Sequence, residues 1–422
     1  MKRYSEYKDS GVKWIGEIPG HWKIMRLRAY LSMYSEKNHP DKQLLSVTRE
    51  SGVIVRNTES KEENHNYIPD DLSGYKLVRI GDFAINKMKS WQGSYGVSNF
   101  EGIVSPAYYV CKLKFPYKDF FSNAIRCKAY IPFFTQYSKG IRVDQWDLSP
   151  IALKNIPFFE PPLPEQEAIV TYLDSKVAKI DEYISIAEKK IAALEELKQT
   201  IIAEAVTRGI HKDVPMKDSG VKWIGMIPEH WKIRKMKFVF KERSEKGYPN
   251  EPVLSATQSN GVIPQSMYEN RVVVVNKGFE NLKLVCKGDF VISLRSFQGG
   301  IEYAYYRGII SAAYTILTKS AEFLNEGYVK NLFKSHPFVQ LLKTCVTGIR
   351  EGQNINYSLL RDKYIPVPPL AEQQEIVTYI EAKVANINQL CQAERSQIEK
   401  LKEYKQRLIS DVVTGKVKVT ND

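Results

Sequence analysis

The chain contains one long sequence twice. Residues 8–24 (KDSGVKWIGEIPGHWKI) return as residues 217–233 (KDSGVKWIGMIPEHWKI), with only two substitutions. A repeat of roughly 208 residues is far longer than a solenoid unit, whose period is about 20 to 50 residues. Each copy should therefore be a whole domain with its own hydrophobic core, and the chain is a tandem duplication.

Shorter matches follow in the same order in both copies. They are Ser46-Val47-Thr48 with Ser255-Ala256-Thr257, Gly81-Asp82-Phe83 with Gly288-Asp289-Phe290, Gly140-Ile141-Arg142 with Gly348-Ile349-Arg350, and Pro161-Pro162-Leu163 with Pro368-Pro369-Leu370. Between these matches the two copies differ freely. A shared framework that carries two different surfaces indicates two related but unequal targets.

The charge balance favours an anionic partner. Lys and Arg exceed Asp and Glu by 61 to 48, a net charge of +13, which is typical of nucleic-acid-binding proteins but also of merely cationic surfaces.

No apolar run reaches the ~18 residues that span a bilayer, and the first residues lack the apolar stretch of a signal peptide, so we expect a cytoplasmic protein. Five dispersed cysteines predict reduced thiols and argue against a structural zinc site.

Two long segments predict helices that carry a coiled-coil seam. Residues 165–207 contain no Gly or Pro, and the equivalent part of the second copy has the same composition. Alternating steps of four and three residues select a mostly apolar row in each segment, which is the heptad pattern of a coiled coil. The predicted seam consists of Leu173, Val177, Ile180, Ile184, Ile191, Leu194 and Lys198 in the first helix, and of Ile380, Val384, Ile387, Ile398, Leu401, Lys405 and Leu408 in the second.

The length of these helices favours pairing with each other. Some 43 helical residues make a rod of about 65 Å, longer than one domain of this size can cover. We therefore expect an antiparallel coiled coil, with Lys198 and Lys405 fixing its register. The alternative is that each helix packs on its own domain.

Prolines before each helix and a glycine after it mark the ends of the two long helices. The predicted domain limits are a globular domain at 1–164, a helix at 165–208, a linker and second globular domain at 209–371, a second helix at 372–414, and a tail at 415–422.

The globular parts favour strands with a few shorter helices. Short β-branched runs between Gly-containing turns predict strands at 77–80, 83–85, 271–275, 283–285 and 290–293, and a helix is expected at 327–344. The predicted fold class is α+β: two homologous globular domains joined by two long antiparallel helices.

The segment after each Gly-Asp-Phe strand is the best candidate for contact with DNA bases. It combines a cation, an aromatic ring, an amide and a Gly turn. Gln can bind adenine and Arg can bind guanine at their major-groove edges, while Lys suits phosphate. The alternative is that the two aromatic residues are core residues beside solvated cations. The candidates are Lys87, Lys89, Trp91 and Gln92 in the first copy, and Arg295, Phe297 and Gln298 in the second.

Other repeated residues have weaker functional signals. Arg142 and Arg350 suit either phosphate contacts or structural ion pairs. The repeated His-Trp pairs at 21–22 and 230–231 are interpreted as anchors for the chain rather than as catalytic groups.

The sequence shows no phosphate-binding Gly-Lys-Ser/Thr loop, no complete amino-methyltransferase loop and no nuclease carboxylate pattern. We therefore predict no catalytic residues and no metal site in this chain.

Taken together, the repeated head motif, the Gly-Asp-Phe strand and the Pro-Pro-Leu-x-Glu-Gln helix start resemble the specificity subunits of type I restriction-modification systems. The resemblance covers the full length of the chain. It implies that two target-recognition domains each read one half of a bipartite DNA sequence, while the paired helices set the gap and dock two methyltransferase subunits. An endonuclease-translocase subunit would complete the complex, and S-adenosylmethionine, ATP and Mg²⁺ would be bound by these partners.

Two other classes of function remain as alternatives. One is a coiled-coil assembly scaffold whose positive charge is incidental; the other is an enzyme acting alone, which the missing motifs disfavour. DNA affinity that falls steeply with salt distinguishes the first alternative from a DNA-recognition subunit.

Overall fold

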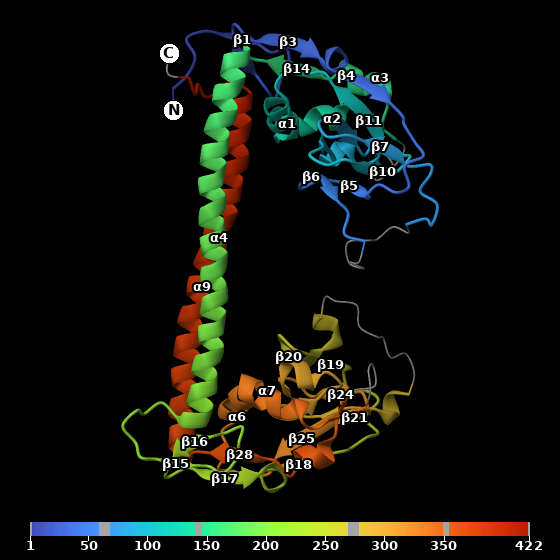
Figure 1. Cartoon of the computed structure of the whole chain (residues 1–422). Coiled ribbons are helices and arrows are strands. Elements are labelled where there is room, and N and C mark those ends of the chain that lie inside the picture. Colours follow the sequence, from blue (N-terminus) through green and yellow to red (C-terminus); the bar gives the residue numbers. More distant parts are fainter. Residues whose placement is uncertain (1, 59–67, 141–145, 269–277, 349–353, 421–422) are drawn as a thin grey trace. The chain divides into compact units, whose positions relative to one another are not determined.

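The chain divides into two compact units, each of which draws on both copies of the repeat (Figure 1). A computed structural model describes residues 2–58, 68–140, 146–268, 278–348 and 354–420. Unit 1 combines Met1–Ala187 with Ser396–Asp422, and unit 2 is Glu188–Arg395. Each unit thus contains the globular part of one copy, the start of that copy's long helix and the end of the other long helix.

Unit 1 is built around an antiparallel four-stranded sheet. Its strand order is β4 (Leu31–Tyr34), β11 (Tyr109–Leu113), β8 (Phe83–Ile85) and β9 (Tyr95–Val97). The other named strands of the unit pair two by two: β1 (Tyr7–Asp9) with β2 (Glu17–Pro19), β3 (Lys23–Arg26) with β14 (Pro157–Glu160), β5 (Leu45–Thr48) with β6 (Gly52–Val55), β7 (Lys76–Val78) with β10 (Gly102–Val104), and β12 (Ser138–Lys139) with β13 (Asp147–Leu148).

Unit 2 repeats this topology strand for strand. Its four-stranded sheet has the order β18 (Phe240–Arg243), β25 (Thr315–Lys319), β22 (Phe290–Ile292) and β23 (Glu302–Tyr303). Its two-stranded sheets are β15 (Met216–Asp218) with β16 (Met226–Pro228), β17 (Lys232–Lys235) with β28 (Tyr364–Val367), β19 (Leu254–Thr257) with β20 (Gly261–Pro264), β21 (Lys283–Val285) with β24 (Gly308–Ile310), and β26 (Val346–Thr347) with β27 (Asn354–Ile355). The predicted α+β class and the predicted duplication are confirmed.

Most of the predicted strands are present, with shifted ends. The segments at 83–85, 283–285 and 290–293 are β8, β21 and β22. The strand predicted at 77–80 ends earlier, at Val78, because the amide N–H of Arg79 donates to a carboxylate oxygen of Asp82 at 2.8 Å and starts the turn. The strand predicted at 271–275 lies outside the described residues.

The helical stretch predicted at 327–344 is present, but the structure divides it into two helices. They are α6 (Glu326–Lys334) and α7 (His336–Lys343), separated by Ser335 in an extended conformation. Pro337 has no amide N–H and is tolerated only in the first turn of a helix, so a new helix starts here. The other short helices introduced at this point are α1 (Lys118–Arg126), α2 (Ile131–Tyr137), α3 (Pro150–Asn155), α8 (Tyr357–Leu360), and the 3₁₀ helices η1 (Leu27–Ala29), η4 (Met236–Phe238), η5 (Gln265–Met267) and η6 (Phe279–Asn281).

Aromatic side chains fill the core between each sheet and its first short helix. In unit 1 the rings of Phe83 on β8 and Phe121 on α1 are 5.6 Å apart, and both are fully buried. In unit 2 the rings of Phe290 on β22 and Phe333 on α6 are 5.2 Å apart, and both are fully buried. These contacts fix the strands from which the candidate turns start.

The two long helices begin slightly earlier than predicted. They are α4 (Leu163–Arg208) and α9 (Leu370–Val413). Pro164 fits inside α4 because the first-turn amides of a helix have no intrahelical partner. Among the described residues, no helix is both long and apolar enough to cross a membrane.

Within each unit the start of one long helix packs against the end of the other. Leu173 of α4 shares the core of unit 1 with Leu408 and Val412 of α9, and Ala205 of α4 shares the core of unit 2 with Ile376 and Ile380 of α9. The helices therefore run antiparallel in both units. The positions that the sequence predicts as the seam are all buried or partly buried, whereas most of their neighbours are exposed.

The two predicted seam lysines have equivalent partners on the facing helix. The ammonium of Lys405 is 2.7 Å from both carboxylate oxygens of Asp181 in unit 1. In unit 2 the ammonium of Lys198 donates to the side-chain oxygen of Asn388 at 3.3 Å. Asp181 and Asn388 occupy the same position of the two helices, so both contacts define one antiparallel register.

Replacing both lysines in the variant Lys198→Leu/Lys405→Leu is expected to raise the melting temperature and loosen the register. Apolar residues at partly buried polar positions are often stabilising, here by about 1 kcal/mol per site, which is roughly 2 to 4 °C for units of this size. Thermal unfolding measures the gain, and cross-linking of cysteines placed along the seam measures the register. The exposed variant Lys189→Leu is the matched control; a melting temperature no higher than that of the control would contradict the prediction.

The repeated head motif anchors both long helices to each globular part. In unit 1 a buried carboxylate, Glu165 near the start of α4, lies 2.8 Å from His21 Nε2 and accepts the indole N–H of Trp22 at 3.2 Å. In unit 2, His230 lies 2.7 Å from Glu372 at the start of α9. The ends of the opposite helices reach the same motifs, because Gly415 packs on Trp22 and Gly209 on Trp231. This geometry supports an anchoring role for the His-Trp pairs.

Candidate nucleic-acid interface

The turn after the central strand has the same construction in both units. In unit 1 it forms η2 (Ser90–Gln92), preceded by Lys89 and closed by Gly93 at φ 97°. In unit 2 it forms α5 (Ser296–Gly299), preceded by Arg295 and closed by Gly300 at φ 88°. A positive φ favours glycine, which explains a Gly at each of these two positions. The closing Gly300 stands one residue after Gly299, the repeat partner of Gly93. We call residues 88–92 and 294–298 the reading turns.

A buried serine holds each reading turn. The hydroxyl of Ser90 donates to the Lys87 carbonyl at 3.1 Å, and the hydroxyl of Ser296 accepts the amide N–H of Ser293 at 2.8 Å. With the serine inside, the cation before it faces solvent: Lys89 and Arg295 are both exposed. Gln298 is exposed as well, while Gln92 is partly buried.

The reading turn of unit 1 borders a polar hollow of about 700 Å³. Lys89 and Gln92, both predicted from the sequence, line it. Further lining residues were not predicted: Arg49 and Glu50 at the tip of the β5–β6 hairpin, and Asn86, Tyr75 and Tyr108. The hollow offers cationic, amide, carboxylate and phenol groups side by side, which is the mixture that base edges and phosphates require.

A hydrogen bond at the edge of this hollow orders two of its polar groups. The Asn86 amide donates to the Tyr108 hydroxyl at 3.2 Å, and its oxygen accepts the amide N–H of Met88 at 3.2 Å. Burial raises the pKa of Tyr108, so its hydroxyl stays protonated and can donate at neutral pH. The polar groups beside the turn are therefore preorganised.

Lys87 is engaged inside unit 1. Its ammonium lies 2.7 Å from a carboxylate oxygen of Asp147, and this hydrogen bond raises the pKa of Lys87. Lys87 therefore offers less free positive charge to an anionic ligand than the exposed Lys89. Of the two lysines predicted for phosphate contact, Lys89 is the better placed.

The aromatic residues of the turns pack inside their own units. Trp91 is partly buried, its ring centre is 5.3 Å from that of Trp146, and its indole N–H donates to the Met88 carbonyl at 3.2 Å. Phe297 is partly buried against the core of unit 2. These contacts favour the structural interpretation of both rings. Arg142 and Arg350 lie outside the described residues.

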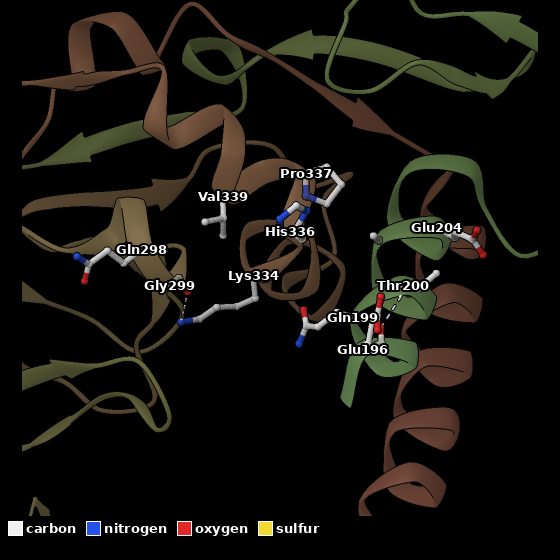
Figure 2. A pocket seen from close by; sticks show the side chains of 11 residues that line it. Glu196, Gln199, Thr200, Glu204, Gln298, Gly299, Lys334, His336, Pro337 and Val339 are labelled. Carbon is white, nitrogen blue, oxygen red and sulfur yellow. Dashed lines mark hydrogen bonds between the residues drawn. The ribbon is translucent and has the colours of Figure 1, made fainter. Parts of the chain in front are cut away.

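The reading turn of unit 2 borders a cavity of about 650 Å³ against α4 (Figure 2). Gln298, Gly299, Lys334 and His336 line one side, and Glu196, Gln199 and Glu204 of α4 line the other. Figure 2 shows the Gln298 side chain pointing away from α4. The carboxylates of Glu196 and Glu204 make the helix side of the cavity unsuitable for an anionic ligand, whereas the Gln298 amide points to the opposite side.

The sequence does contain a signal for Arg49 and Glu50, which line the hollow but were not predicted to do so. The triplet Ser46-Val47-Thr48 and its repeat partner Ser255-Ala256-Thr257 stand directly before unlike residues, Arg49-Glu50-Ser51 and Gln258-Ser259-Asn260. A constant strand followed by a variable tip is the pattern expected of a recognition loop on a rigid scaffold. We call residues 49–51 and 258–260 the hairpin tips.

The described residues contain no cluster of His, Cys, Asp and Glu with the arrangement of a metal site. The five cysteines are free thiols, and burial raises the pKa of Cys127 to about 11 and that of Cys111 to about 12. These two thiols are therefore protonated at neutral pH and poor nucleophiles.

Comparison with known proteins agrees with this architecture. Residues 228–400 match the profile of the type I restriction modification DNA specificity domain. A curated relative, the type I restriction enzyme MjaVIII specificity subunit of Methanocaldococcus jannaschii, is 25% identical, and the match covers 98% of each chain.

Two solved structures share the fold. One belongs to a study of complex assembly and conformational transition of the type I R-M system, with a TM-score of 0.64, 17% identity, and coverage of 95% of this chain and 99% of that one. The other is the HsdS subunit of Thermoanaerobacter tengcongensis, with a TM-score of 0.51, 17% identity, and coverage of 97% and 100%. Residues 228–400 therefore carry the DNA specificity domain of type I restriction-modification systems, and over nearly its full length the chain is similar to a specificity subunit of these systems.

Proposed function

We propose that each unit reads one half of an asymmetric bipartite DNA sequence. One observation carries this proposal: the same turn stands at the same place in two units of identical topology, but with different side chains. Unit 1 presents Lys89 where unit 2 presents Arg295, and the shared glutamine is partly buried as Gln92 but exposed as Gln298. Equal frames with unequal contact residues are what two different half-sites require.

Replacing Arg295 or Gln298 by Ala is expected to relax base preference in one half-site only. Each base contact contributes about 1 to 3 kcal/mol of discrimination, so the preference should fall roughly 5- to 150-fold. Selection of bound duplexes from a randomised pool measures both half-sites at once. The exposed Lys330→Ala in the same unit is the control; unchanged preference in both halves would remove this turn from the readout.

The competing scaffold function predicts a different response to salt. Several Lys and Arg contacts to phosphates release counterions, so DNA affinity should fall by about 10³ or more between 50 and 200 mM salt. A scaffold with incidental charge would bind weakly and lose little over the same range. Measuring the dissociation constant at four salt concentrations separates the two functions.

We propose that the outer faces of the long helices dock two methyltransferase subunits. Two pairs of exposed apolar residues in the helices are repeat partners: Tyr183 with Leu390, and Leu197 with Tyr404. Tyr183 is 62% exposed, although large apolar side chains gain from burial. Two equal sets of exposed apolar residues suit one partner that binds twice.

Helical spacing places these residues on one face of each helix. The partly buried Tyr172 and the exposed Tyr183 and Leu197 are separated by 11 and 14 residues, close to three and four whole turns at 3.6 residues per turn. In α9 the equivalent residues Tyr379, Leu390 and Tyr404 have the same spacing. The ammonium groups of Lys176 and Lys383 lie 5.7 and 5.6 Å from the ring centres of Tyr172 and Tyr379, so even the flanking cations match.

In this proposal the chain recognises the DNA sequence, and its partner subunits carry out the reactions on the DNA. In this proposal the methyltransferase subunits bind S-adenosylmethionine and extrude the adenine to be methylated. An endonuclease-translocase subunit uses ATP and Mg²⁺. The helices act as the spacer that sets the gap between the half-sites, since the readers are attached at their ends.

A further inference from the structure

One cation occupies the same place in both units, at the end of the first short helix of the sheet domain. It is Arg126, the last residue of α1, in unit 1, and Lys334, the last residue of α6, in unit 2. Both side chains are only partly exposed, and the two helices otherwise differ strongly in sequence. A cation at this position in both copies suggests that both side chains make the same kind of contact.

In unit 1 the guanidinium of Arg126 joins two segments that are distant in sequence. One nitrogen donates to the carbonyls of Arg49 at 3.0 Å and Glu50 at 2.9 Å, in the hairpin tip. The other donates to the carbonyl of Tyr95, just after the reading turn. Burial lowers the pKa of Arg126, because the charged guanidinium loses contact with water.

In unit 2 the ammonium of Lys334 makes the same connection with different chemistry. It donates to the carbonyl of Gln258 in the hairpin tip at 3.3 Å. It also donates to the carbonyl of Gly299 in α5 at 3.0 Å (Figure 2). It also lies 2.5 Å from the buried carboxylate of Glu302 on β23. Gln258 and Arg49 are equivalent residues, so both cations hold the same tip.

The surroundings show that the tip is packed tightly against the neighbouring strand. A Cβ on Gly52 would lie 2.9 Å from the Arg126 guanidinium, and a Cβ on Gly96 would lie 3.2 Å from the Cα of Gly52. In unit 2 a Cβ on Gly299 would lie 2.8 Å from the side chain of Gln258. Each hairpin tip therefore lies directly beside the structure that carries its reading turn.

We propose that Arg126 and Lys334 are positioning residues for base readout: each locks a hairpin tip and a reading turn into one rigid recognition surface. The inference rests on the proposed reading of half-sites and adds the tips to it. Arg49 and Gln258 then contact DNA together with the turn residues, and the unlike tips contribute to the difference between the half-sites.

A lysine should not fully replace the arginine at position 126 in maintaining base preference. The fork of Arg126 reaches three carbonyls at once, and a lysine ammonium at the same place has a shorter reach and fewer donors. Arg126→Lys should therefore retain only part of the preference that Arg126→Met loses. In unit 2, Lys334→Met alone would leave Glu302 buried without its cation, so the neutral pair Lys334→Met/Glu302→Gln is the suitable variant.

The test is selection from a pool of randomised duplexes by the complex assembled with the full chain. Arg126→Met should lower base preference in the half-site read by unit 1 at least tenfold, leave the other half-site unchanged, and keep affinity for unrelated duplex within twofold. Lys334→Met/Glu302→Gln should do the converse. Hydrogen exchange should show faster exchange of the tip amides but not of β8 or β22. Lys128→Met, two residues from Arg126, is the control and should change neither half-site.

The outcomes separate this inference from the proposed function. If the unaltered chain selects no bipartite sequence, the proposed function fails. If it does select one and both Met variants keep both preferences, the positioning role is overturned. Loss of the cooperative thermal transition of a unit in its Met variant, together with full preference in Arg126→Lys, would also overturn it, because the cation would then be needed only for folding.

Discussion

Removing one heptad from each long helix is expected to bring the two half-sites closer together without changing their sequences. The deleted segments are 188–194 and 392–398, which contain a facing pair, since the ammonium of Lys190 lies 2.5 Å from the carboxylate of Glu394. Deleting both keeps the alternation of four and three residues along each seam. Seven residues correspond to about 10 Å of helix, and at 3.4 Å per base pair the gap should shorten by up to about three base pairs.

Mapping of methylated adenines in cells that express the altered chain with its partners measures the new gap. The matched control removes residues 188–194 alone, so that Lys198 no longer faces Asn388 and the pairing loses its register. That control should have a lower melting temperature and little activity. An unaltered gap in a double-deletion protein that folds and methylates normally would show that the helices are not the spacer.

A charge on the outer helix face is expected to remove one methyltransferase subunit per altered unit. The variants are Tyr183→Asp on the part of α4 in unit 1 and Leu390→Asp on the part of α9 in unit 2. A buried Tyr or Leu contributes about 1.5 to 3 kcal/mol, and a carboxylate left in an apolar interface adds a further cost. Each substitution should weaken its own site at least a hundredfold.

Light scattering of mixtures with purified methyltransferase subunit counts the bound copies. The unaltered chain should bind two, each single variant one, and the double variant none. Ser185→Asp, which adds the same charge on a different face of α4, should still bind two. Two bound copies in the double variant would place the docking surface elsewhere.

The architecture could be predicted because the duplication and the heptads are periodic signals that span many residues. The repeat fixed two like domains, and the seam from Leu173 to Lys198 marked the side of α4 that the structure buries. The ends of helices and strands were harder to predict from the sequence. Pro337 divides α6 from α7, and the carboxylate of Asp82 ends β7 early; both effects depend on single residues within otherwise regular patterns.

The candidate interface was predicted only in part, because it is assembled from segments distant in sequence. The reading turns follow a repeated strand and could be recognised, and Lys89 and Gln92 do line the polar hollow. Arg49 and Tyr108 reach the same hollow from other strands, and only the sheet topology brings them there. The tertiary partners of Lys87 and Trp91 were likewise invisible in the sequence, since Asp147 and Trp146 lie more than fifty residues away.

Selection of bound duplexes from a fully randomised pool by the assembled complex tests the central claim most directly. The account predicts two short conserved blocks of unlike sequence, separated by a gap of constant length whose bases are unconstrained. A single continuous motif, two identical blocks, or no enrichment at all would contradict it.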